Sequence, residues 1–289
     1  MDKVDLHAHT NKSDGELSPE DFVDQAIASG LKAVAITDHD TISGCKEAVE
    51  YAQGKGIEIV PGIEISCSDK DKGFTEIHVV GLFVDYTNKN LIAFSEKVHD
   101  ERINQKRQMI EKLQELGFDI TFDEVVKITN YSFGRPHVAA ILMEKYPDKF
   151  PDMKSVFDQY LGNDKPGFVA RAFYPTIGEA ITLIKNAGGV AILAHPGIYD
   201  ETRVFELLDY FVSRGGQGLE TSYSYTKINR IPEDDSTKRN TQFRDYAEQH
   251  GLLQSGGSDF HGPKRKPVVL GELDIPYSVL EKIRSTSQS

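Results

Sequence analysis

The chain has 289 residues, enough for a large hydrophobic core in one domain or in one domain that carries an insertion. Its composition is that of an ordinary globular protein, with 39% hydrophobic and 27% charged residues, and 33 Lys and Arg against 45 Asp and Glu give a net charge of −12. This charge disfavours broad binding to duplex DNA or long RNA. A small anionic substrate can still bind where a local cation, such as a metal ion, overrides the global field.

The two cysteines, Cys45 and Cys67, are too few for a disulfide framework and lack the short spacing of a Cys-type metal site, which fits a reducing cytoplasm. The first ten residues, MDKVDLHAHT, contain no apolar signal region. No window approaches 18 uninterrupted apolar residues, so no transmembrane helix is expected. We therefore expect a cytoplasmic protein without membrane contact.

In the first third of the chain, short apolar runs alternate with helical patterns. A helix is predicted over 18–30, where Ser18 is a suitable N-cap, Pro19 suits the first helical position and Gly30 ends the helix. A second helix is predicted over 42–54. The expected strands of this part are 4–6, 33–37, 57–66 and 76–84.

The pattern changes after residue 87, because no convincing core strand occurs from 88 to 168. A long, charged, amphipathic helix is expected first, and shorter helices follow it. We interpret 88–168 as a helical insertion that caps the substrate site. The segments 1–87 and 169–289 then form the two parts of one α/β domain.

The alternation of helices and strands resumes after the insertion. The expected helices are 176–187, 201–214 and 236–250, and the expected strands are 189–195, 218–222 and 252–258. Seven strands separated mainly by helices predict a parallel α/β architecture, and periodicity leaves a closed barrel and an open doubly wound sheet as alternatives. The charged segment 222–240 is expected to be a long loop, either a mobile lid or a specificity loop.

Residues that can bind metal ions lie in or just after nearly every predicted core strand. Because the carboxyl ends of parallel strands share one face of the fold, we expect these side chains to converge there. A single His after a strand is more often a hydrogen-bonded loop residue, and only the combination indicates a site. The candidate ligands are His7, His9, Asp14, His39, Glu64, His78, His195, Asp259 and His261.

Imidazole and carboxylate without thiolate are typical of Zn, Mn or Fe sites. Nine ligands are too many for one ion and suit two or three ions with a shared bridging carboxylate. Such ions would activate a bridging water to hydroxide near neutral pH and hold a phosphoryl group in line. His99, in the charged helix, and His250, just before Gly251, are interpreted as residues outside the site.

Six segments, DLHAHTNKSDG, AITDHDT, PGIEIS, EIHVVGL, AILAHPG and SGGSDFHG, resemble the motifs of the PHP (polymerase and histidinol phosphatase) family of metal-dependent phosphoesterases. The resemblance implies a distorted (β/α)7 barrel with a helical insertion between strands four and five and a trinuclear metal centre. It implies one ion held by His7, His9, Glu64 and Asp259, a second by Glu64, His78 and His195, and a third by Asp14, His39 and His261.

Within the family, the chain resembles most the branch of nucleoside 3',5'-bisphosphate phosphatases and 5'→3' exoribonucleases. The segment FGRPHVA resembles the phosphate-contacting segment of that branch, which implies that Arg135 binds a phosphate with two hydrogen bonds and that His137 donates another. Lys165 is a further candidate cation for substrate binding. The alternative is a helix N-terminus with Pro136 at its first position and a solvated Arg135.

The leading hypothesis is a metal-dependent phosphomonoesterase that uses two to three divalent ions (Mn, Zn or Fe). Its substrate would be a nucleoside 3',5'-bisphosphate or AMP-like nucleotide, or the 5' end of a short RNA. Arg135 and His137 would hold a phosphate, and Asp259 or a metal-bound water would protonate the leaving oxygen. The alternatives are a phosphatase of another small metabolite, such as histidinol phosphate, and a non-catalytic module. The SDG at 13–15 and the insertion speak against the former, and the complete ligand set speaks against the latter.

Overall fold

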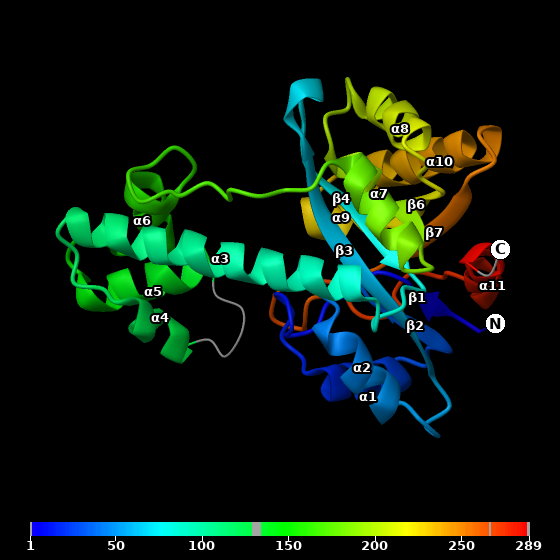
Figure 1. Ribbon diagram of the computed structural model, residues 1–289, viewed down its shortest axis with the longest axis horizontal. Helices are drawn as coiled ribbons and strands as arrows, with labels where there is room; N and C mark the ends of the chain where they lie inside the picture. The colour runs from blue at the N-terminus through cyan, green and yellow to red at the C-terminus, as the bar shows by residue number, and fades with distance from the viewer. Residues whose placement is uncertain (1, 129–133, 266, 288–289) are drawn as a thin grey trace. The chain divides into compact units, whose positions relative to one another are not determined.

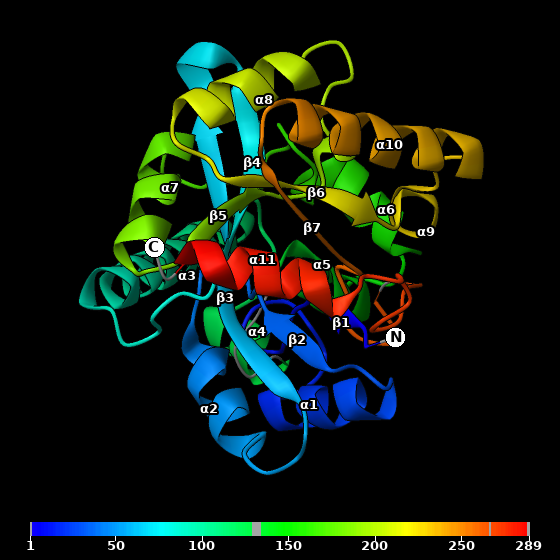
Figure 2. The same cartoon turned by 90° about the vertical axis from the view of Figure 1, so that its right-hand side faces the viewer.

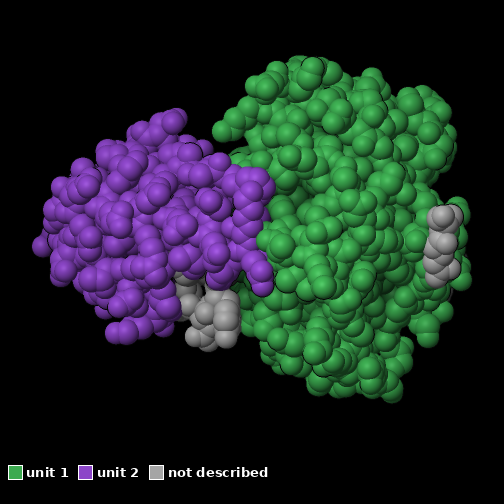
Figure 3. Space-filling model, in the orientation of Figure 1, with its two compact units in different colours: residues 1–95, 174–289 green, residues 96–173 purple. Residues whose placement is uncertain are grey.

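The computed structural model describes residues 2–128, 134–265 and 267–287. The chain divides into two compact units, coloured separately in Figure 3. The first unit consists of Met1–Ser95 and Tyr174–Ser289, and the second consists of Glu96–Phe173. The first unit contains a seven-stranded sheet, whereas the described part of the second unit contains helices and turns (Figure 1).

The seven strands of the first unit lie in sequence order across the sheet. They are β1 (Val4–Asp5), β2 (Ala33–Ile36), β3 (Glu58–Asp69), β4 (Phe74–Leu82), β5 (Val190–Leu193), β6 (Gly218–Tyr223) and β7 (Leu253–Gly257). The sheet curves until its ends meet, since the Leu6 amide donates to the Gly256 carbonyl at 3.1 Å (Figure 2). Sequential order and near closure confirm the distorted barrel and exclude the doubly wound alternative, whose strand order reverses.

The prediction of parallel pairing is wrong at β4, which is antiparallel to both β3 and β5. The physical reason is the connection between β3 and β4, a short 3₁₀ turn (Lys70–Lys72) followed by Gly73 at φ 74°. A parallel pair needs a crossover of a dozen or more residues, which this turn cannot provide. Because β3 continues into this hairpin as far as Asp69, Glu64 lies inside the strand and not near its end.

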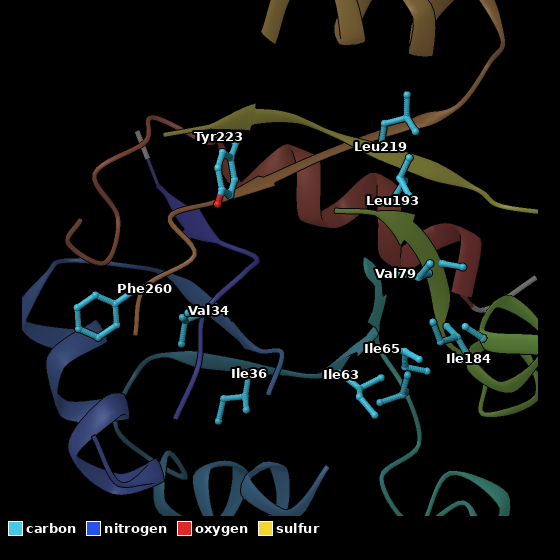
Figure 4. Close-up of a cluster of buried hydrophobic side chains, with 14 of the residues drawn as sticks. Val34, Ile36, Ile63, Ile65, Val79, Ile184, Leu193, Leu219, Tyr223 and Phe260 are labelled. Atoms are coloured by element: carbon cyan, nitrogen blue, oxygen red, sulfur yellow. The ribbon is translucent and has the colours of Figure 1, made fainter. Parts of the chain in front are cut away.

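Helices cover the outer face of the barrel. They are α1 (Pro19–Ala28), α2 (Ser43–Tyr51), α7 (Ile177–Asn186), α8 (Val204–Ser213) and α10 (Glu233–Gln249). The Ser18 side chain accepts a hydrogen bond from the Asp21 amide, which confirms the predicted N-cap of α1. Figure 4 shows the apolar layer beneath these helices, where Ile63 and Ile65 of β3 lie near Val79 of β4 and Ile184 of α7.

The inner face of the barrel changes from apolar to polar along its strands. Val60 and Val80 belong to an inner cluster that Leu280 and Ile283 of α11 (Tyr277–Ser287) complete. Side chains alternate between the two faces of a strand, so Glu64 of β3 and His78 of β4 share the inner face with these valines. The α11 helix therefore packs against the apolar part of the interior, and the remaining part is lined by polar side chains that include Glu64 and His78.

The segment 222–240 is largely helical, so the prediction of a long loop is wrong. It contains the end of β6, the short helix α9 (Tyr225–Asn229) and the first half of α10. The physical reason is the start of α10, where Pro232 precedes three acidic residues in the first turn. Carboxylates at a helix N-terminus interact favourably with the exposed amides and the helix dipole.

The second unit has its own hydrophobic core, which includes Leu113, Leu142 and Phe150. Its helices are the greater part of α3 (Lys89–Glu115), α4 (Phe122–Ile128), α5 (Arg135–Lys145) and α6 (Met153–Val156), and α6 continues into a π turn at Phe157–Leu161. Although α3 is long, it is highly charged. Within the described residues, no helix is both long and apolar enough to cross a membrane.

Candidate metal centre

Six histidines and three carboxylates of the first unit lie together at the polar part of the barrel. Neighbouring imidazole rings have centroids 4.1 to 6.0 Å apart. All nine ligands predicted from the sequence belong to groups whose ligand atoms lie within 4.8 Å of one another. The groups are His9, Asp14, His39 and His261; His7, His9 and Asp259; His7, Glu64 and His195; and His39, Glu64 and His78.

Glu64 is shared between two of these groups, and its side chain is only 1% exposed. Its Oε1 lies 2.9 Å from Nδ1 of His78 and 3.0 Å from Nε2 of His195. Its Oε2 lies 2.9 Å from Nδ1 of His39 and 3.3 Å from Nε2 of His7. The two oxygens therefore face different sets of imidazoles, which is the arrangement of a carboxylate that bridges two cations.

The surroundings of His9 and Glu64 favour the protonation states of metal ligands. Burial lowers the pKa of His9 well below its ordinary value, and the neighbouring His261 and His39 lower it further. Burial alone would raise the pKa of Glu64, but His39, His7 and His78 hold it well below its ordinary value. A neutral imidazole beside an ionised carboxylate is the state in which both groups can bind a metal ion.

Buried nitrogens of the cluster also indicate a binding site for a cation. Nε2 of His7 and both ring nitrogens of His9 are buried, and none of them forms a hydrogen bond with the described residues. A buried polar atom without a partner costs about 1–3 kcal/mol, so several such atoms at one place are unfavourable in the protein alone. Divalent cations would bind these nitrogens and neutralise the charge of the carboxylates, so the residues present fit a metal centre.

The turn that carries Asp14 is held by a buried carboxylate that the sequence analysis did not single out. Asp38, just after β2, accepts hydrogen bonds from the Thr10 amide at 2.7 Å and from the hydroxyls of Thr10 and Ser13 at 2.6 Å each. These bonds bring Asp14 to 3.1 Å from Nε2 of His261. Asp38 thus links the loops that follow β1 and β2.

The end of β7 is shaped by close backbone contacts and a tyrosine. A Cβ atom at Gly257 would lie 2.4 Å from the backbone nitrogen of His7, so only glycine permits this approach of β7 to the segment after β1. Asp259 follows with φ 53°, and its Oδ2 accepts a hydrogen bond from the Tyr223 hydroxyl at 2.7 Å. Its Oδ1 lies 3.2 Å from Nε2 of His9.

Two further charged residues near the candidate ligands were missed from the sequence. Glu220 of β6 is buried and lies 2.8 Å from Nδ1 of His7. The signal that could have revealed it is a carboxylate inside a predicted core strand, where an unpaired charge is costly. Arg265 lies 3.6 Å from Oδ2 of Asp14. It follows the SDFHG motif in a charged stretch that resembles an ordinary surface turn.

The expected substrate-binding residues belong to the second unit. Arg135 is the first residue of α5 and donates to the Leu161 carbonyl at 3.0 Å and to Oδ1 of Asn163 at 2.9 Å, so it is not merely solvated. Nδ1 of His137 lies 2.9 Å from the Gly134 amide, which donates to it, so a neutral His137 carries its proton on Nε2. Lys165 is exposed. The residues excluded from the site, His99 and His250, are both exposed.

Imidazoles and carboxylates gathered inside the polar part of the barrel are typical of metal-dependent enzymes built on α/β barrels. The family model of the PHP domain matches residues 5–167. A 3',5'-nucleoside bisphosphate phosphatase from Chromobacterium violaceum is 35% identical over 267 residues, which cover 91% of this chain and 88% of the relative. A 5'-3' exoribonuclease from Haemophilus influenzae is 35% identical over 281 residues, which cover 96% and 97% of the two chains.

Solved structures agree with the sequence matches. The structure of an amidohydrolase from Chromobacterium violaceum with bound sulfate has a TM-score of 0.78 and 32% identity, and the match covers 98% of this chain and 96% of the other. The chain therefore belongs to the PHP family. It is a metal-dependent phosphoesterase, that is, a hydrolase of phosphate esters.

Proposed function

We propose that this enzyme hydrolyses a phosphomonoester of a nucleotide, either a nucleoside 3',5'-bisphosphate or the 5' end of a short oligoribonucleotide. Relatives of nearly full length are named as enzymes with these two activities. The net charge of −12 supports a small substrate, because long nucleic acids would be repelled. The sulfate bound to the related amidohydrolase supports an anion site of phosphate size in this fold.

The observation that carries the proposal is the pair of ligand groups that share Glu64. We assign two to three divalent ions (Mn, Zn or Fe) to the nine clustered residues. His7, His9, Glu64 and Asp259 would hold one ion, Glu64, His78 and His195 a second, and Asp14, His39 and His261 a third. When bound, such ions lower the pKa of a coordinated water and neutralise charge on the phosphoryl oxygens.

The side chains of the protein fix the positions at which this chemistry occurs. Glu64 would hold two ions at a set separation, because its two oxygens face different imidazoles. We assign Asp259 first to metal binding, since the Tyr223 hydroxyl bonded to its Oδ2 stabilises the carboxylate. To protonate the leaving oxygen, Asp259 would first have to gain a proton against this hydrogen bond.

We further propose that Arg135, His137 and Lys165 bind a phosphate of the substrate. Support comes from the N-terminus of α5, where backbone amides and the helix dipole favour an anion and where Arg135 and His137 both lie in the first turn. Arg135 also contacts Leu161 and Asn163, in the turn that carries Lys165. Arg suits this role because its planar guanidinium can donate two parallel hydrogen bonds to a phosphate.

Exchange of Arg135 for Ala is expected to raise KM for a nucleoside bisphosphate about 10- to 100-fold, because a charge-assisted contact is lost. Arg135→Lys keeps the positive charge but cannot donate two parallel hydrogen bonds to one phosphate, so an intermediate KM is expected. Steady-state kinetics with the three proteins tests this. Lys154→Ala is the matched control, since Lys154 is an exposed cation of the same unit. Equal KM values for Arg135→Ala and the control would remove Arg135 from the substrate site.

The proposed activity itself is tested with the Mn-loaded, full-length protein. We expect release of phosphate from adenosine 3',5'-bisphosphate and of mononucleotides from 5'-phosphorylated oligoribonucleotides, measured side by side with histidinol phosphate. A larger kcat/KM for histidinol phosphate would favour the metabolite phosphatase instead. Absence of product from every nucleotide substrate, with metal bound at one or more ions per chain, would contradict the proposal.

A further inference from the structure

The carboxylate of Glu220 contacts two candidate metal ligands that follow different strands. Glu220 lies on β6 and is 1% exposed. Its Oε1 is 2.8 Å from Nδ1 of His7, and its Oε2 accepts a hydrogen bond from the backbone amide of His195 at 2.6 Å. Glu220 belongs to none of the groups of candidate ligands. It is therefore adjacent to the metal centre without being one of its ligands.

The contact with His7 determines which ring nitrogen carries a proton. A carboxylate can only accept hydrogen bonds, so a neutral His7 beside Glu220 has its proton on Nδ1. The lone pair then resides on Nε2, the nitrogen that lies 3.3 Å from Oε2 of Glu64 and 3.7 Å from Oδ1 of Asp259. His7 is thus oriented with its metal-binding nitrogen toward the other ligands.

The contact with His195 holds an unfavourable backbone conformation. His195 has φ 31° and ψ 56°, in the left-handed region that residues other than glycine rarely adopt. Its amide is directed at Oε2 of Glu220, while its ring places Nε2 3.0 Å from Oε1 of Glu64. One buried carboxylate therefore fixes the ring tautomer of one ligand and the backbone of another.

We infer that Glu220 is a positioning residue of the metal centre, which orients His7 and His195 for metal binding. The inference rests on the proposed metal centre. Outer carboxylates that accept the second N–H of a metal-binding imidazole fix its tautomer and raise its basicity. Glu220 does so for His7 and at the same time connects the segments that follow β1 and β5 to β6.

The exchange Glu220→Gln separates this role from simple space filling. The Gln amide has nearly the same shape but only one accepting oxygen for two donors. The backbone amide of His195 cannot change its proton, so the Gln oxygen is expected to turn toward it. The NH2 group then faces Nδ1 of His7, which must accept, and the proton of His7 moves to Nε2. An Nε2–H directed at the other ligands blocks metal binding there.

Two measurements test the inference. In metal-free wild-type protein with ¹⁵N-labelled histidine, NMR should show a proton on Nδ1 of His7, and in Glu220→Gln this nitrogen should carry none. Calorimetric titration with Mn²⁺ should show an affinity about 10- to 100-fold weaker in the variant. The control is Glu58→Gln on β3, a carboxylate that accepts from the Tyr277 hydroxyl. Its Mn²⁺ affinity should equal that of the wild type.

A wild-type His7 without a proton on Nδ1 would overturn the inference, and this outcome needs no variant to fold. Unchanged Mn²⁺ affinity in a folded Glu220→Gln, verified by circular dichroism, would overturn it as well. Failure of the proposed function is recognised separately, because it appears in the wild-type protein as absent metal binding or absent hydrolysis of nucleotides.

Discussion

Exchange of Glu64 for Gln is expected to lower kcat by a factor of about 10³ or more and to reduce the number of bound ions per chain. The amide has one oxygen that can bind a cation, whereas Glu64 directs its two oxygens at different imidazoles. After the exchange, one group of imidazoles would face a neutral amide oxygen in place of a carboxylate oxygen. The other group would face the NH2 group. Metal content measured by plasma mass spectrometry, together with phosphate release under saturating substrate, checks both parts.

The control for this experiment is Glu58→Gln, which removes a carboxylate from the same strand at the position where it contacts Tyr277 and Arg284. We expect it to affect stability and to leave kcat and metal content unchanged. The bridging role of Glu64 would be wrong if the Gln variant kept its full metal content and a kcat within about tenfold of the wild type.

Removal of metal by a chelator is expected to abolish hydrolysis and to lower the melting temperature. An ion that binds only the folded protein stabilises it by about 2.7 kcal/mol at 100 times its Kd. In a domain of this size, such a change corresponds to about 5–10 °C in melting temperature. This binding free energy includes the satisfaction of the buried nitrogens of His7 and His9. Scanning fluorimetry during Mn²⁺ addition to the chelated protein measures the recovery.

Two variants make this second experiment specific. His78→Ala removes a residue of the cluster, so its melting temperature should respond less to Mn²⁺ than that of the wild type. His99→Ala removes an exposed histidine of α3 and should respond as the wild type does. Hydrolysis by protein that contains less than about a tenth of an ion per chain would contradict a metal-dependent reaction.

Sequence patterns were sufficient to predict the cluster of candidate ligands, because of the chemistry of its residues and the geometry of the barrel. Imidazoles and carboxylates in or just after successive strands converge wherever those strands curve into one barrel. The prediction assumed parallel strands, but its outcome for His78 does not depend on the direction of β4. His78 joins the cluster although β4 runs opposite to its neighbours, because its side chain is on the inner face.

Where the predictions failed, the deciding interactions were local turns or distant contacts. The hairpin turn at Lys70–Gly73 reverses β4, and the acidic first turn of α10 begins a helix inside the expected loop of 222–240. Neither feature alters the apolar periodicity on which the strand and helix predictions rest. Both errors concern connections between elements, and neither changes the set of clustered ligands.

The sequence by itself determined the class of fold, the nine ligand candidates and the phosphoesterase family, because periodicity and the order of the motifs are properties of the chain. Only the tertiary structure decided that the two oxygens of Glu64 face different imidazoles, that Asp38 holds the turn of Asp14, and that Glu220 contacts His7 across 213 positions of sequence. The physical reason is that a hydrogen bond or a shared ligand depends on distances of about 3 Å between atoms. Such distances are set by how the strands register and curve, and not by the spacing of residues along the chain.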